Sequence, residues 1–245
     1  MAHVPSSTRL RAVLLHDAVS GVTVETDFTD PVPGVLWLPP ASPTRLVLLG
    51  HGGSGHKRAP RIVSHAEWFA ARGVAAMALD GPFHGDRVPT PLTAPEYQAL
   101  AVARGPESVL DQIAGDWLAA ISTHLPAVRN IGYMGFSLGA RYGLPTAVAL
   151  GDRLRCLVIG KFGLQSTMPP GLDAPHRIRA DAARLTAPTM LHAQWDDTLF
   201  PRAGAFELFD VIGAADKRLI AFPGEHGGNP PDAHALWREF MLAHL

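Results

Sequence analysis

One serine in this chain lies in a sequence pattern that can make its hydroxyl a nucleophile. The pattern is Gly135-x-Ser137-x-Gly139, between a short apolar stretch and a segment of helical character. Small residues on both sides of the serine let a strand and a helix pack tightly around a sharp turn, which raises the hydroxyl above the sheet. The first N–H groups of that helix then point toward the group that the serine attacks. We therefore take Ser137 as the candidate nucleophile, with an inert serine in a glycine-rich turn as the alternative.

A serine hydroxyl is a weak nucleophile at neutral pH, so it needs a base to accept its proton and a carboxylate to orient that base. His226 is the candidate base, because glycines close on both sides allow its loop to bend toward the serine. Asp197, four residues before Pro201, is the candidate carboxylate. The neighbouring Asp196 competes with it and is otherwise expected to cap or hold the turn. A structural role for His226 is the alternative to catalysis.

Nucleophilic attack on a carbonyl also requires two backbone donors for the negative charge that develops on oxygen. The N–H of Leu138, directly after the nucleophile, is the first candidate. The second is the N–H of Gly53, in the loop His51-Gly52-Gly53 that follows an apolar stretch. A phosphate-binding loop is the competing interpretation, but the Gly-Lys-Ser/Thr ending of a P-loop is missing.

These candidates follow apolar stretches of strand length, which alternate with helix-length segments along most of the chain. Ligands bind beyond the carboxyl ends of the strands in sheets of this kind, so the candidates are expected to meet there. The pattern predicts an α/β fold of one domain, 1–245, with a mostly parallel sheet covered by helices on both faces. Expected strands are 22–25, 35–38, 46–49, 74–79, 131–136, 156–159, 189–193 and 217–222, and the main expected helices are 60–72, 106–124, 201–212 and 231–245.

Residues 88–105 interrupt this alternation. They contain Pro89, Pro91 and Pro95 and show no clean periodicity. A proline-rich excursion of this length inside a compact domain is typical of a functional loop or a small lid. We expect 88–105 to be a lid over the site.

Substrate contacts are predicted for Phe83, His84, Phe162 and Trp195, which lie beside the candidate catalytic loops. Aromatic residues at strand ends often belong to the core, so only part of this set is expected to line an apolar pocket. Lys161 could contact a substrate carboxylate, but a solvated surface lysine is the favoured interpretation.

Composition argues against several other classes of protein. Among the twelve histidines there is no His-Glu-x-x-His spacing and no thiolate cluster, so we expect no catalytic metal. A net charge of −1 without a basic stripe makes nucleic acid an unexpected partner. The single cysteine, Cys156, suits a reducing compartment. The apolar run 12–15 is too short for a signal peptide and no stretch reaches membrane-span length, so we expect a cytoplasmic protein.

Taken together, the motifs resemble the α/β-hydrolase superfamily over about residues 22–245, including the chain order of nucleophile, acid and base. The resemblance implies an eight-stranded sheet, no cofactor, and hydrolysis of esters or other acyl compounds. One segment is similar to dienelactone-hydrolase-like and related small serine esterases. Dienelactone hydrolases proper have cysteine where this chain has Ser137, which shifts the expectation toward general carboxylic esters. The motifs are His51-Gly52-Gly53, Gly135-x-Ser137-x-Gly139, Asp197 before Pro201, Gly224-x-His226-Gly227 and, for the esterase segment, Asp80-Gly81-Pro82-Phe83-His84-Gly85-x-Arg87.

The expected function is hydrolysis of an ester of a small or medium-sized carboxylic acid through Ser137, His226 and Asp197. The partner would be a small-molecule ester, and the protein a monomer or a homodimer. The alternatives are amide or thioester cleavage, acyl transfer, a ligand-binding homologue of low turnover, or a cofactor-free lyase, because a fold does not fix a function.

Overall fold

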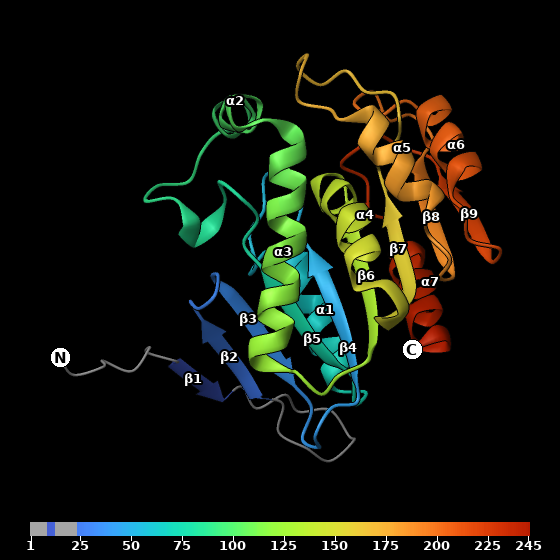
Figure 1. The fold of residues 1–245 in the computed structure, drawn as a ribbon. Coiled ribbons are helices and arrows are strands. Elements are labelled where there is room, and N and C mark those ends of the chain that lie inside the picture. Colours follow the sequence, from blue (N-terminus) through green and yellow to red (C-terminus); the bar gives the residue numbers. More distant parts are fainter. Residues whose placement is uncertain (1–8, 13–23) are drawn as a thin grey trace.

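The computed structural model describes residues 9–12 and 24–245. Within them, nine strands form one sheet in the order β1-β2-β3-β5-β4-β6-β7-β8-β9 (Figure 1). Strands β2 to β9 confirm the predicted sheet of about eight strands, and β1 adds an edge. The strands are β1 Arg9–Ala12, β2 Val24–Phe28, β3 Gly34–Leu38, β4 Arg45–Gly50, β5 Ala75–Leu79, β6 Asn130–Phe136, β7 Leu154–Gly160, β8 Thr189–Gln194 and β9 Lys217–Phe222. Residues 22–23 of one expected strand and 13–15 of the short apolar run lie outside the described residues.

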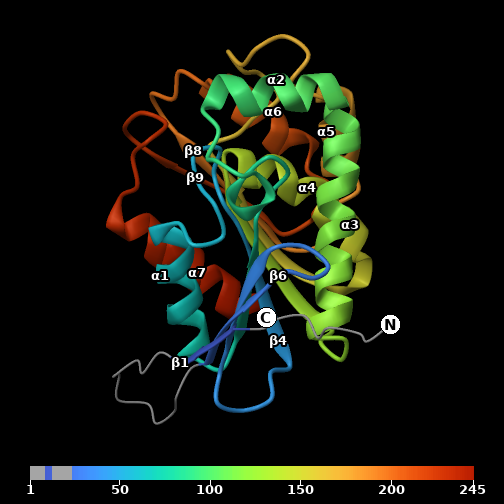
Figure 2. The same cartoon turned by 90° about the vertical axis from the view of Figure 1, so that its left-hand side faces the viewer.

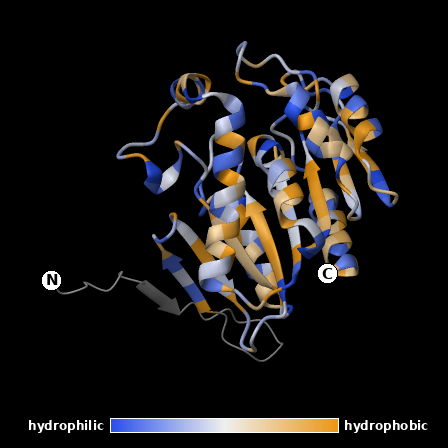
Figure 3. Cartoon of the chain, viewed as in Figure 1, coloured by the Kyte–Doolittle hydropathy of each residue, from blue (hydrophilic) through white to orange (hydrophobic). Residues whose placement is uncertain are grey.

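The sheet is mostly parallel, as predicted. Strands β4 to β9 are parallel to their neighbours within that group, whereas β1, β2 and β3 pair antiparallel at one edge, with β3 antiparallel to β5. Central strands such as β4 and β7 are hydrophobic almost throughout (Figure 3), because both of their faces are covered.

Helices cover both faces of this sheet. α1 and α7 pack on one face, and α3, α4, α5 and α6 pack on the other, as seen when the sheet is viewed edge-on (Figure 2). Two short 3₁₀ turns, η1 and η2, complete the fold. The bounds are α1 Pro60–Ala70, η1 Gly85–Arg87, α2 Ala94–Arg104, α3 Pro106–His124, α4 Leu138–Leu150, η2 Gly151–Arg153, α5 Pro175–Ala183, α6 Arg202–Val211 and α7 Pro231–His244.

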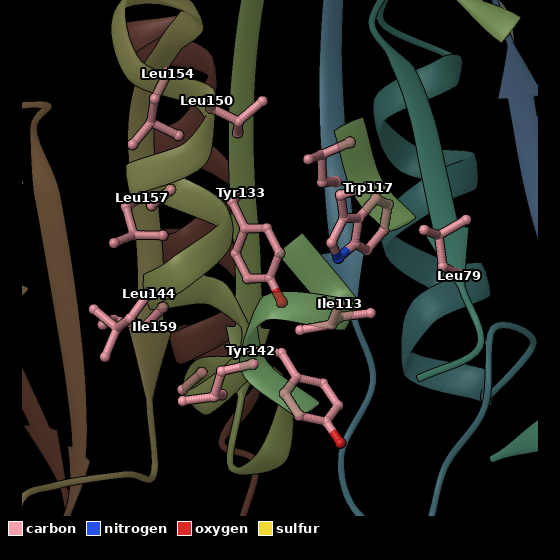
Figure 4. Close-up of a cluster of buried hydrophobic side chains, with 14 of the residues drawn as sticks. Leu79, Ile113, Trp117, Tyr133, Tyr142, Leu144, Leu150, Leu154, Leu157 and Ile159 are labelled. Carbon is pink, nitrogen blue, oxygen red and sulfur yellow. The ribbon is translucent and has the colours of Figure 1, made fainter. Parts of the chain in front are cut away.

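The larger core lies between the sheet and helices α3 and α4 (Figure 4). Tyr133 of β6 is fully buried there, and its ring meets the edge of Trp117 of α3 at a centroid distance of 6.1 Å. Its hydroxyl donates a hydrogen bond to the carbonyl oxygen of Gly139, 2.7 Å away, in the first turn of α4. The core therefore holds the junction between β6 and α4 in place.

Residues 88–105 are more regular than the sequence suggested. They contain α2, which crosses the end of the sheet where the parallel strands finish (Figure 2). Thr93 and Glu96 form a capping box at its start, so Pro95 lies in the first turn, where proline is tolerated. In the part of the chain that the structure describes, no helix combines the length and the hydrophobicity needed to cross a membrane.

Candidate active site

Ser137 occupies the corner between β6 and α4. Its backbone has φ 59° and ψ −120°, a conformation that is costly for a residue other than glycine. The N–H of Ser137 donates to the carbonyl oxygen of Gly160 in β7, 2.9 Å away, and this bond helps to hold the corner. The two flanking positions need glycine because neighbouring backbone leaves no room for a side chain. A β-carbon at Gly135 would lie 2.5 Å from the Gly139 carbonyl oxygen, and one at Gly139 would lie 2.6 Å from the Gly50 carbonyl oxygen.

The three predicted catalytic side chains meet at this corner. His226 Nε2 lies 3.0 Å from Ser137 Oγ, and His226 Nδ1 lies 2.7 Å from Asp197 Oδ2. Because the carboxylate can only accept, Nδ1 carries the proton and Nε2 is left to accept one from the serine. This arrangement can remove the hydroxyl proton as the oxygen attacks an electrophile.

Asp197 is held in its ionised form by its surroundings. The carboxylate is buried; Oδ2 faces His226, and Oδ1 accepts the N–H groups of Leu199 and Phe200, each at 2.9 Å. Burial opposes ionisation, but these hydrogen bonds outweigh it, so the pKa of Asp197 lies below the ordinary aspartate value.

Asp196 serves a different purpose. Its Oδ2 accepts the N–H of Gly224 at 3.0 Å, and its own N–H donates to the Gly224 carbonyl oxygen at the same distance. These two bonds tie the loop after β8 to the start of the loop that carries His226.

Lys161 fixes the other end of the His226 loop, and the prediction of a solvated surface lysine was wrong. Only 4% of the residue is exposed. The ammonium donates to the Gly228 carbonyl oxygen and to Asn229 Oδ1, the latter at 2.7 Å. Burial and the nearby Arg61 cation lower the pKa of Lys161 to about 8. Its charge is therefore used to hold the loop.

The loop His51-Gly52-Gly53 is fixed by the segment after β5. His51 Nε2 accepts the N–H of Gly81 at 2.9 Å, so Nδ1 carries the proton that it donates to the Gly52 carbonyl oxygen at 2.7 Å. Burial, together with the neighbouring His84, lowers the pKa of His51 to about 4. His84 Nε2 lies 2.9 Å from the carbonyl oxygen of Gly53. The esterase-like segment thus positions the backbone of Gly53.

Asp80 anchors the esterase-like segment at its first residue. Its fully buried carboxylate accepts the backbone N–H and the ammonium of Lys57, at 2.9 and 2.6 Å, and the N–H of Asp86 at 2.9 Å. Burial again opposes ionisation, but these donors outweigh it and lower the pKa of Asp80.

The predicted oxyanion donors, Gly53 and Leu138, line the same cavity as Ser137 and His226. Neither N–H donates to another group among the residues that the structure describes. Two unpaired donors on a cavity wall beside a serine can bind an oxygen that gains negative charge.

The cavity has a volume of about 310 Å³. Its wall is mainly apolar, with polar groups from the serine, the histidine and a few neighbours. It is lined by Gly53, Ser54, Ala94, Tyr97, Gln98, Ser137, Leu138, Arg141, Phe162, Met168, Leu172, Leu199, Phe200 and His226. Helix α2 contributes Ala94, Tyr97 and Gln98 to this wall. That residues 88–105 act as a lid remains a prediction.

Of the four side chains predicted to contact substrate, only Phe162 lines this cavity. Trp195 is 45% exposed: its backbone N–H donates to the Phe222 carbonyl oxygen, and its ring packs beside Arg202. Phe83 packs against the core, and His84 lies behind Gly53. Their proximity in sequence to catalytic loops did not indicate which way the side chains point.

Arg141 and Tyr97 are among the wall residues that the sequence analysis did not predict. Arg141 lies one helical turn after Ser137 and therefore on the same face of α4. It bonds to the Leu172 carbonyl oxygen and forms an ion pair with Asp173 at 3.1 Å, which ties α4 to the opposite rim. Tyr97 lies in the first turns of α2, and the signal that could have found it is the Thr93-x-x-Glu96 capping box.

Comparison with known proteins places this geometry in a family. No family model matches the chain, and no curated protein matches it. Among solved structures, a cold-adapted esterase from an Arctic intertidal metagenomic library is 30% identical, with a TM-score of 0.77 over 94% of this chain and 97% of that one. The chain belongs to the α/β-hydrolase superfamily.

More distant α/β-hydrolase neighbours support the fold alone. An acetyl xylan esterase from Paenibacillus sp. R4 is 20% identical, with a TM-score of 0.71 over 98% of this chain and 90% of that one. TT1662 from Thermus thermophilus is 18% identical, with a TM-score of 0.69 over 90% of this chain and 97% of that one. Within residues 9–12 and 24–245, no three His, Cys, Asp or Glu side chains are grouped so that they could hold a metal ion.

Proposed function

We propose that this α/β-hydrolase is a serine esterase that cleaves carboxylic esters of small or medium-sized acids. The observation that carries the proposal is the chain of contacts from Asp197 through His226 to Ser137, at 2.7 and 3.0 Å, which opens onto an apolar cavity. The similarity to the cold-adapted esterase supports an ester as the substrate.

In this mechanism, His226 accepts the proton of Ser137 as Oγ attacks the ester carbonyl carbon. Asp197 stabilises the imidazolium that results, and the N–H groups of Leu138 and Gly53 bind the oxygen of the tetrahedral intermediate. The intermediate collapses, the carbon–oxygen bond to the alcohol breaks, and His226 returns its proton to the departing oxygen. Water, activated by His226, then attacks the acyl-enzyme and releases the acid.

The cavity favours a modest acyl group. Its volume of about 310 Å³ is at the lower end of the range of roughly 300–1,000 Å³ that is usual for small-molecule sites. Phe162, Leu172 and Phe200 give it an apolar wall, which suits a hydrocarbon chain or ring.

Amide or thioester cleavage, acyl transfer and lyase chemistry would use the same residues, and the ester is favoured by the esterase neighbour. The dienelactone-hydrolase-like branch is the proposed position within the superfamily, on the segment from Asp80 to Arg87. The buried single cysteine, Cys156, suits a cytoplasmic enzyme. The proposed enzyme acts as a monomer or homodimer.

The test is turnover of a panel of p-nitrophenyl esters from acetate to laurate, together with labelling by a fluorophosphonate. We expect labelling of Ser137 and a preference for the shorter esters. Ser137→Ala should lose labelling and turnover while its melting temperature stays close to that of the parent. Labelling that persists in Ser137→Ala would contradict the proposed function.

A further inference from the structure

Tyr97 brings a phenol from the covering helix α2 to the catalytic end of the cavity. It is only 7% exposed, and it lines the cavity together with Ser137, Gly53 and His226. A β-carbon built on Gly53 would lie 2.3 Å from the Tyr97 hydroxyl oxygen. The hydroxyl therefore rests against the α-carbon of the residue whose N–H is the proposed second oxyanion donor.

The Tyr97 hydroxyl is not used to hold the protein together. It has no hydrogen-bond partner among the described residues, although a phenol that is mostly buried usually finds one. Tyr97 instead lines the cavity that also holds Ser137 and His226. A polar group that is almost buried, unpaired and beside a reacting centre is available to a bound molecule.

The position of Tyr97 is nevertheless well fixed. Its ring packs against that of His84 with centroids 4.5 Å apart, and His84 is itself bonded to the carbonyl oxygens of Pro82 and Gly53. The helix that carries Tyr97 begins with the capping box of Thr93 and Glu96. A hydroxyl placed in advance in this way can stabilise developing charge without the cost of reorganising.

We propose that the Tyr97 hydroxyl is a third donor to the carbonyl oxygen of the substrate, beside the N–H groups of Gly53 and Leu138. The phenolic proton stays on Tyr97 throughout, and the hydrogen bond strengthens as Ser137 attacks and the oxygen becomes negative. Tyr97 is then a catalytic residue, and α2 completes the active site as well as covering it. This inference rests on the proposed serine mechanism.

Tyr97→Phe removes the hydroxyl and keeps the ring against His84. Loss of one oxyanion donor typically lowers kcat by about 10²–10³-fold, so we expect roughly a 100-fold fall in kcat with little change in KM. A trifluoromethyl ketone should lose affinity in parallel, because its hemiketal with Ser137 places a negative oxygen at the same position. Since the hydroxyl has no partner in the described protein, the melting temperature should not fall.

Tyr142→Phe is the matched control. It removes the same atom from another buried tyrosine, which does not line the cavity with Ser137. Its kcat should equal that of the parent. In a crystal structure of the unmutated protein with the bound ketone, the hemiketal oxygen should lie within hydrogen-bond distance of the Tyr97 hydroxyl.

Three results would overturn the inference: an unchanged kcat in Tyr97→Phe, a rise in KM alone, or a hemiketal oxygen out of reach of Tyr97. These failures are distinct from failure of the proposed function. If Ser137→Ala keeps its activity, the serine mechanism is wrong. If Ser137→Ala is inactive and Tyr97→Phe is not impaired, only the role of Tyr97 is wrong.

Discussion

Asp196 and Asp197 are adjacent along the chain, yet their carboxylates bind different groups of the same loop. Asp197 accepts from the imidazole of His226 at 2.7 Å, whereas Asp196 accepts from the backbone N–H of Gly224 at 3.0 Å. One carboxylate therefore orients the histidine, and the other holds the start of the loop that carries it. The two roles can be separated by experiment.

Asp197→Asn should lower kcat by about 10⁴-fold, because an amide that replaces the orienting carboxylate favours the wrong tautomer of the histidine. Asp196→Asn keeps an acceptor for Gly224 and is the matched control, with an expected loss of about tenfold or less, roughly 1.4 kcal/mol in activation free energy. Steady-state kinetics on p-nitrophenyl acetate and thermal melts of both variants decide the matter. A larger kcat loss in a folded Asp196→Asn protein would reverse the two assignments.

The crowded turn beside Ser137 gives a prediction about stability. A methyl group at Gly139 would meet the backbone oxygen of Gly50, which has little room to move. Gly139→Ala should therefore lower the free energy of unfolding by about 1–3 kcal/mol and displace Ser137, with a loss of activity. Gly115→Ala is the control: a β-carbon there has no atom of a described residue within 4 Å, so alanine should stabilise α3 by about 0.5–1 kcal/mol. Urea denaturation measures the free energy of unfolding of both variants. Equal changes in Gly139→Ala and Gly115→Ala would contradict the packing argument.

The burial of His51 predicts that the folded protein loses stability in weak acid. In the folded protein its pKa is lowered to about 4, chiefly by burial, while in the unfolded chain it is near the ordinary value of about 6.5. The unfolded state therefore binds a proton first as the pH falls. Stability decreases between about pH 6.5 and 4, by at most the order of 3 kcal/mol.

The control is His51→Gln, whose amide can replace both hydrogen bonds of the imidazole but does not titrate. The difference in free energy of unfolding between the parent and this variant should shrink, or change sign, as the pH falls from 7 to 4. Urea titrations across that range measure it. Parallel pH profiles for the two proteins would show that His51 does not contribute.

The sequence predicted those features that repeat along the chain or occur as short motifs. The strand 217–222 and the helix 106–124 were predicted with the bounds that the structure has. In the helix, Val109, Ile113, Trp117 and Ile121 repeat every four residues. Ser137, Asp197 and His226 were expected to lie together because the strand ends of a parallel sheet meet at one edge, and the structure brings them together. The structure adds the distances between them.

What the sequence did not predict depends on side-chain direction across the fold. Lys161 follows a strand and looks like any exposed lysine, and only the return of residues 228–229 shows that it is buried. Helix α2 was missed because the prolines of residues 88–105 suggested irregular structure, although Pro89 and Pro91 precede the helix and Pro95 lies in its first turn. Trp195 and Tyr97 could not be ranked as pocket residues without knowing which loop each one faces.

The last prediction concerns Lys161, whose ammonium holds Gly228 and Asn229 two and three residues after His226. Lys161→Met keeps most of the buried stem but removes both bonds, so the imidazole should lose its fixed position. A displacement of about 1 Å can cost up to 10²-fold in rate, and we expect kcat to fall by roughly 10–100-fold. Lys217→Met is the matched control: that lysine also bonds to backbone carbonyl oxygens, those of Phe209, Asp210 and Ile212, but lies at the far end of β9. The control should lower the melting temperature and leave kcat unchanged. If both variants lose stability but keep the kcat of the parent, Lys161 supports the fold and does not position the histidine.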